Sequence, residues 1–194
     1  MQPATHTPAL KGLAVRPAFD RVCEMRKRGA IDDGELASRL GPRHVGLVDS
    51  GVEAGLWYPI ELQDRLLRIV SEVDGGGDDH YLVAFGRETA RAVTHSAAMQ
   101  WLIEGARALG PRAGRALVRM ARVGFNFGTY TFEGDTMDQF VVRCTEVDPM
   151  PTSIGLNIQG FIEQVASDWR RRNLACVFER PHRGEILFRV KPRL

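Results

Sequence analysis

The stretch GFNFGTYTF, residues 124–132, decides the fold class of this chain. Before it, apolar residues recur at the spacing of a helix, and from Gly124 onward the period changes to two, as in a strand. The run Glu133-Gly134-Asp135 is typical of a turn and leads into a second alternating segment, about 138–147. The sequence therefore predicts a β-hairpin at this point.

Helical patterns occupy most of the chain before the hairpin. Helices are expected to begin at Pro17, at Asp32 or Asp33, at Trp57-Tyr58-Pro59, at Asp78 and at Pro111. The helix that opens at Trp57 carries an apolar stripe and ends at the glycines 75–77. The stretch from Asp78 extends to about Leu109, and the one from Pro111 ends near Val123.

After the hairpin, one more helix and a second hairpin complete the pattern. The helix is marked by Ile158, Ile162, Val165 and Trp169, and the hairpin by alternating residues on both sides of the turn at 181–184. This order predicts an α+β fold, with helices packed on one face of a twisted antiparallel sheet. We expect a flexible N-terminal arm over residues 1–10 and one domain over residues 11–194.

Composition excludes several classes of protein. Hydrophobic residues make up 44% of the 194 residues and charged residues 26%, which is typical of a globular chain. The net charge of +2 does not indicate a nucleic-acid partner, and no segment has the length and apolarity of a membrane span. The three cysteines, Cys23, Cys144 and Cys176, have neither disulfide-framework nor zinc spacing, so we expect a cytoplasmic protein without a bound metal.

Several short segments together resemble one superfamily. They are Trp57-Tyr58-Pro59, Gly86-Arg87, Gly110-Pro111, Phe125-Asn126-Phe127-Gly128 and the final helix and hairpin. In order and spacing, from about Gly12 to Val190, they resemble a bacterial branch of the superfamily of heme-NO-binding-like domains, 4-vinyl-reductase-type domains and TRAPP small subunits. The resemblance implies a helix layer over a twisted sheet, a homodimer, and an apolar pocket for a small molecule, an acyl chain or heme.

The sequence departs from the heme-binding members of that superfamily. Those members share a Tyr-x-Ser-x-Arg signature, and the nearest match in this sequence, residues 130–134, lacks both the serine and the arginine. The cysteines that metal-sensing members carry near the last hairpin are also missing. We therefore expect no cofactor, and we place a heme or gas sensor third among the functions considered.

Six residues are candidates for an apolar ligand site under the long helix. They are Trp57, Tyr58, Tyr81, Phe85, His95 and Met99. Aromatic and methionine side chains suit an apolar pocket, and a mid-helix histidine such as His95 can hydrogen-bond a ligand. Plain core packing, with His95 paired at the edge of the core, is the alternative interpretation.

Arginine supplies 23 of the 26 basic residues, and four arginines lie on one helix face. Arg112, Arg115, Arg119 and Arg122 recur at spacings of three, four and three. Such a face can bind phosphates, acidic lipids or an acidic protein partner, and a solvated helix face in an arginine-rich chain is the alternative interpretation, favoured for this helix.

No arrangement of residues typical of catalysis is present in the sequence. The glycines 75–77 lack the lysine and serine or threonine of a phosphate-binding loop, and Asp78 and Asp79 after them would repel an anion. We therefore expect a non-enzymatic regulatory protein that binds a small apolar ligand or a protein partner. The alternative is a scaffold protein that uses the arginine face.

Overall fold

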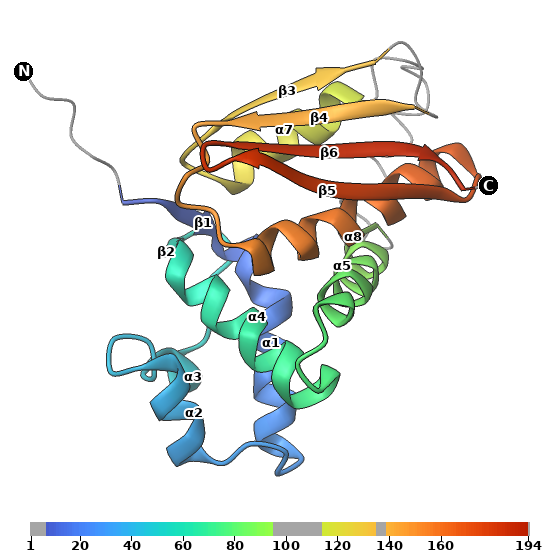
Figure 1. Cartoon of the computed structure of the whole chain (residues 1–194). Coiled ribbons are helices and arrows are strands. Elements are labelled where there is room, and N and C mark those ends of the chain that lie inside the picture. Colours follow the sequence, from blue (N-terminus) through green and yellow to red (C-terminus); the bar gives the residue numbers. More distant parts are fainter. Residues whose placement is uncertain (1–6, 95–113, 135–138, 194) are drawn as a thin grey trace, which may run out of the picture.

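The computed structural model describes residues 7–94, 114–134 and 139–193. Helices gather in the part of the molecule formed by the first half of the chain, and a four-stranded sheet forms the opposite part (Figure 1). The helix α8 (Thr152–Arg170) lies between them, and packs against α5 on one side and the sheet on the other. The expected α+β fold is confirmed.

Five helices form the first half of the chain. They are α1 (Gly12–Lys27), α2 (Asp33–Leu40), α3 (Leu47–Ser50), α4 (Ile60–Gly75) and α5 (Asp79–Thr94). The apolar stripe expected on α4 is buried, because Leu66 and Val70 are inaccessible to solvent. Gly76 ends α4 in the left-handed conformation, which glycine adopts without a steric penalty. Of the long helix expected up to Leu109, the part beyond Thr94 lies outside the described residues.

A short two-stranded ribbon was not expected from the sequence. It pairs β1 (Ala9–Lys11) with β2 (Trp57–Pro59), so the Trp57 segment is a strand and the helix begins only at Ile60. Ala9 and Leu10, which were expected in a flexible arm, are buried in this ribbon. The helix α1 follows the ribbon directly and begins at Gly12, earlier in the chain than the expected start at Pro17.

The two expected hairpins form one antiparallel sheet. The first consists of β3 (Thr129–Glu133) and β4 (Phe140–Thr145), and the second of β5 (Leu174–His182) and β6 (Glu185–Pro192). Pairing of β4 with β6 joins the hairpins and gives the strand order β3-β4-β6-β5. The helix α7 (Gly114–Gly124) packs against β3, as α8 does against β5.

Two glycines allow α5 and α8 to cross at backbone contact. A Cβ atom on Gly160 would lie 1.9 Å from the carbonyl oxygen of Val83, and one on Gly86 would lie 2.0 Å from that of Asn157. Only glycine fits such a distance, because any other residue would force the helices apart. Gly86, which belongs to the sequence resemblance, is therefore a packing residue.

Side chains of α8 close the free edge of β5. Backbone N–H groups of Leu174, Cys176 and Phe178 donate to Ser167 Oγ (3.2 Å), Glu163 Oε2 (3.0 Å) and Gln159 Oε1 (3.1 Å), respectively. Four helical residues rise about 6 Å and two strand residues about 6.6 Å, so the two sets of groups stay in step. An unpaired strand edge invites association with another strand, and this ladder removes its donors.

Within the described ranges, none of the helices is long and apolar enough to cross a membrane.

Candidate functional site

A pocket lies where the β1–β2 ribbon meets the start of the sheet. Its lining comes from three places: Trp57 of β2, Arg122 near the end of α7, and residues 125–130, which lead from α7 into β3. The volume of the pocket is about 440 Å³. This volume lies within the roughly 300 to 1,000 Å³ of small-molecule sites, but the pocket is an open hollow whose accessible lining is more polar than apolar.

Aromatic rings form a rigid wall of the pocket. Phe125 meets Phe127 edge to face with ring centroids 5.7 Å apart, and it lies 5.9 Å from the ring of Tyr130. The hydroxyl of Tyr130 donates to the backbone oxygen of Phe127 at 3.1 Å, and burial raises the pKa of this hydroxyl. Gly128, at a φ of +79°, makes the turn that brings these rings together.

The opposite wall is an exposed tryptophan with a lysine above it. Trp57 keeps 44% of its surface accessible, and Lys11 Nζ lies 4.3 Å from the centroid of its ring. A hydrogen bond of 2.8 Å to the backbone oxygen of Gly55 holds the ammonium group in place. Such an arrangement is a cation–π contact.

One cationic side chain lines the pocket. Arg122 is exposed there, Lys11 lies over the ring of Trp57, and the carboxylate of Glu146 accepts a hydrogen bond from the lining residue Thr129 at 3.0 Å. Aromatic walls suit a flat apolar group, and a guanidinium group suits a carboxylate, sulfonate or phosphate. The geometry therefore fits a ligand that has both parts.

Comparison with known proteins gives a fold and no closer relation. No protein-family model matches the sequence, and no curated protein matches it. Among solved structures, a point mutant of an H-NOX protein from K. algicida, in the Fe(II) unliganded state, matches with a TM-score of 0.65 at 12% identity, over 95% of this chain and 97% of that one. The chain has the H-NOX fold. This result confirms the heme-NO-binding-like fold expected from the resemblance.

Two further H-NOX structures agree with it. The protein from S. oneidensis, in the Fe(II)NO state, matches with a TM-score of 0.62 at 10% identity over 95% of this chain and all of that one. A point mutant of the T. tengcongensis protein matches with a TM-score of 0.60 at 12% identity, over 94% and 97% of the two chains. At such identities, the match establishes the H-NOX fold alone.

The described pocket does not fit a heme iron. Its lining includes no histidine, cysteine or methionine, and the hydroxyl of Tyr130 is buried and bonded to Phe127. Phe132, whose ring packs on Phe140 at 5.0 Å, stands at the position of the signature serine, and Gly134, which has no side chain, at that of the arginine, so neither residue offers a side-chain donor to a heme carboxylate. Across the described parts of the chain, no group of three or more metal-binding side chains gathers.

Three other residues of the expected ligand site lie away from this pocket. The hydroxyl of Tyr58 accepts a hydrogen bond from the backbone N–H of Glu53 at 2.9 Å, and Phe85 is buried beside the guanidinium group of Arg21. The hydroxyl of Tyr81 donates to Asp74 at 3.3 Å, and burial, followed by the charge of Asp74, raises its pKa. None of the three lines the pocket.

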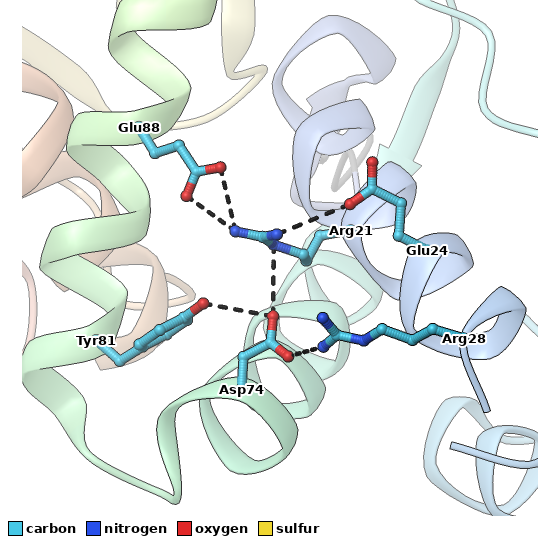
Figure 2. Close-up of polar contacts among 6 residues, drawn as sticks. All are labelled: Arg21, Glu24, Arg28, Asp74, Tyr81 and Glu88. Carbon is cyan, nitrogen blue, oxygen red and sulfur yellow. Dashed lines mark hydrogen bonds and ion pairs between the residues drawn. The ribbon is translucent and has the colours of Figure 1, made fainter. Parts of the chain in front are cut away.

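Figure 2 shows the polar network that engages Tyr81. Arg21 of α1 lies at its centre, 2.9 Å from Glu88 of α5 and 3.5 Å from Asp74 of α4. Arg28 pairs with the same Asp74. The network ties α1, α4 and α5 together by opposite charges, so these residues serve helix packing.

The structure describes only part of the expected arginine face of residues 112–122. Arg119 and Arg122 are exposed on α7, while Arg115 belongs to the helix but its side chain is not among those described. Arg112, like His95 and Met99, lies outside the described residues. Docking of an acidic partner therefore stays a prediction.

The pocket brings together residues that the sequence analysis placed in different sites. Trp57 belonged to the expected ligand set and Arg122 to the expected partner set, yet both line one pocket. Lys11 and Asn126 were not expected in any site. The dense run of aromatic residues around Asn126 was the available signal, but it indicated only a strand.

Proposed function

We propose that this protein is a regulatory binding protein with the H-NOX fold, whose pocket takes a small ligand with a flat apolar part and an anionic group. One observation carries the proposal: Trp57 and Arg122 line the same pocket as the aromatic wall of Phe125 and Phe127. Apolar rings with a few placed polar groups are typical of small-molecule sites. The guanidinium group of Arg122 in the lining favours an anionic group on the ligand.

A fluorescent dye with the required chemistry provides a direct test. Anilinonaphthalene sulfonate has an aromatic body and one sulfonate group, and its emission rises in an apolar site. We expect saturable binding to the folded protein, with a dissociation constant raised about tenfold or more in Trp57→Ala and in Arg122→Gln, since each change removes one recognition group.

A neighbouring arginine offers a matched control. Arg119 is exposed on the same helix and does not line the pocket, so Arg119→Gln removes one charge and should bind the dye as the wild type does. Circular dichroism of each variant verifies that the dye reports a folded protein. Equal affinity in all three variants would show that the dye binds elsewhere and would refute the proposal.

We further propose that the protein catalyses no reaction, acts in the cytoplasm and forms a homodimer. Because α8 closes the edge of β5, this dimer would use a surface other than backbone pairing along β5. Light scattering during gel filtration tests the dimer. A monomeric mass at micromolar concentration would refute that part of the proposal.

A scaffold function is the second candidate, supported by the exposed arginines of α7. Reversing the charge of Arg115 and Arg119 should weaken docking of an acidic protein and reduce its dependence on salt. If the bound proteins are the same for the double variant, the arginine face is not a docking surface.

Heme or gas sensing is the third candidate, supported by the H-NOX fold itself. Its test is titration of the purified protein with hemin, followed by absorbance spectroscopy. A Soret band that shifts and saturates at one equivalent would support it, and the band of free hemin alone would remove it.

A further inference from the structure

The N-terminal strand β1 lies between two segments that line the pocket. On one side it pairs with β2, where Lys11 is opposite Trp57. On the other side Leu10 forms an isolated bridge with Phe125, and the N–H of Asn126 donates to the oxygen of Ala9 at 3.2 Å. Figure 1 shows β1 at this junction, where the helical part of the chain meets the sheet.

The side chain of Asn126 adds two hydrogen bonds to this junction. Its Oδ1 accepts from the N–H of Ala9 at 2.7 Å, and its Nδ2 donates to the oxygen of Thr7 at 3.0 Å. The carboxamide thus pairs with the strand as a backbone amide would, and it also lines the pocket. Asn126 thus makes three hydrogen bonds to residues 7–9, one through its backbone N–H and two through its side chain.

These bonds are of a kind that can open locally. Asn126 is exposed to solvent, and β1 is only three residues long. Each neutral hydrogen bond contributes on the order of 1 kcal/mol, because water replaces the partner on opening. Opening of β1 also exposes the buried side chains of Ala9 and Leu10, so its free energy includes this apolar surface as well as the hydrogen bonds.

We propose that occupation of the pocket locks β1 in place, so that the N-terminal strand is the element through which the ligand regulates the protein. The inference rests on the proposed function. A ligand that contacts Trp57 and Phe125 contacts both neighbours of β1, and β1 is hydrogen-bonded to the segments on which both residues lie. The ligand therefore binds the closed form more tightly, and by linkage it shifts the population toward that form.

Linkage also works in the reverse direction. A change that opens β1 lowers the apparent affinity for the ligand only in proportion to the closed fraction that it removes. Asn126→Ala removes both side-chain bonds, whereas Asn126→Asp keeps an acceptor for the N–H of Ala9 and loses the donor to Thr7. The alanine variant should therefore show the larger effect on strand opening, whereas Asn126→Asp also sets a negative charge in the pocket lining and should weaken binding of an anionic dye by repulsion.

Hydrogen exchange of the full chain, measured by mass spectrometry with and without anilinonaphthalene sulfonate, tests the inference. In the wild type we expect the dye to slow exchange in a peptide covering residues 7–13 about threefold or more, and to leave β6 unchanged. Without dye, Asn126→Ala should exchange roughly five- to thirtyfold faster in this peptide, in line with the loss of one to two hydrogen bonds of about 1 kcal/mol each. Its affinity for the dye should fall only as far as the closed fraction of β1 falls.

A variant that does not bind the dye separates the two proposals. Arg122→Gln leaves the bonds of Asn126 in place, so its exchange without dye should equal that of the wild type, and the dye should no longer slow it. If the dye binds the pocket but leaves exchange of residues 7–13 unchanged, the strand is not coupled and this inference is overturned, while the proposed function stands. If no binding depends on Trp57 or Arg122, the proposed function falls, and this inference with it.

Discussion

Glu163 is a buried carboxylate that joins α5, α8 and β5. Its Oε1 accepts hydrogen bonds from Arg87 Nε at 2.7 Å and from Arg193 Nη2 at 3.0 Å, and its Oε2 accepts from the N–H of Cys176 at 3.0 Å. Only 5% of the residue is exposed. Replacing it by glutamine keeps the shape of the side chain and removes the charge, so Glu163→Gln isolates the electrostatic contribution.

The geometry sets the size of the effect. A carboxamide has one acceptor and one donor group, and all three partners of Glu163 are donors. In one rotamer of the glutamine, the amide oxygen accepts from Cys176 and the NH₂ group faces the donor groups of the two arginines. In the other rotamer, the NH₂ group faces the buried N–H of Cys176, so two donors meet in both cases. Burying a donor without an acceptor costs about 1 to 3 kcal/mol. Arg87 and Arg193 reach solvent in part, which lessens the penalty, so we expect a loss of about 2 kcal/mol.

Urea unfolding followed by circular dichroism measures this loss as a lower midpoint at an unchanged slope. Glu179→Gln is the matched control, because it makes the same substitution in the pair that Glu179 forms with Arg189 at 2.7 Å, on the exposed face of the sheet. Exposed pairs contribute about 0 to 1 kcal/mol. If Glu163→Gln and Glu179→Gln unfold within about 0.5 kcal/mol of each other, the burial argument is refuted.

Two further predictions concern packing and alkaline pH. Gly160→Ala should lower the free energy of unfolding in urea by about 3 kcal/mol or more, because its Cβ would meet the oxygen of Val83 at 1.9 Å. Gly46→Ala, with open space around the Cβ, should change this free energy by less than about 1 kcal/mol. Similar effects at the two sites would contradict the close crossing of α5 and α8. Burial raises the pKa of the Tyr130 hydroxyl and raises that of the Cys144 thiol to about 12, so the folded state keeps these protons after the unfolded chain releases them. The stability that these two protons contribute is complete below pH 9 and is lost as pH rises above 9, by roughly 1.4 kcal/mol per group and pH unit. We expect the phenolate absorbance of Tyr130, assigned with Tyr130→Phe, to appear only as the circular dichroism signal of the folded state disappears. Ionisation of Tyr130 in the folded protein would count against its burial.

Local patterns in the sequence were enough to predict the hairpins and most helices. The alternation after Gly124 and the stripe at Leu66 and Val70 report which face of a segment is buried, and each is complete within one segment. The start of α4 was misplaced, because Trp57-Tyr58-Pro59 becomes a strand only through pairing with Ala9–Lys11. No pattern within either segment indicates this partner.

The site was predictable only in fragments. The sequence singled out Trp57 and Arg122 by residue type and spacing, but it gave each a different function. Asn126 is a polar residue in an aromatic run, and its role depends on two backbone groups of residues 7 and 9. Hydrogen bonds between distant segments leave no periodic trace in a sequence.

By itself, the sequence determined the fold class, the order of helices and strands, and the absence of the heme signature at residues 130–134, because these depend on neighbouring residues and on burial of one face. The tertiary structure alone decided that β4 pairs with β6, that α8 closes the edge of β5, and that Trp57, Arg122 and Asn126 meet at one pocket beside β1. These features arise from contacts between segments that are remote along the chain. Such contacts are selected by the packing of the whole core, and no local pattern specifies them.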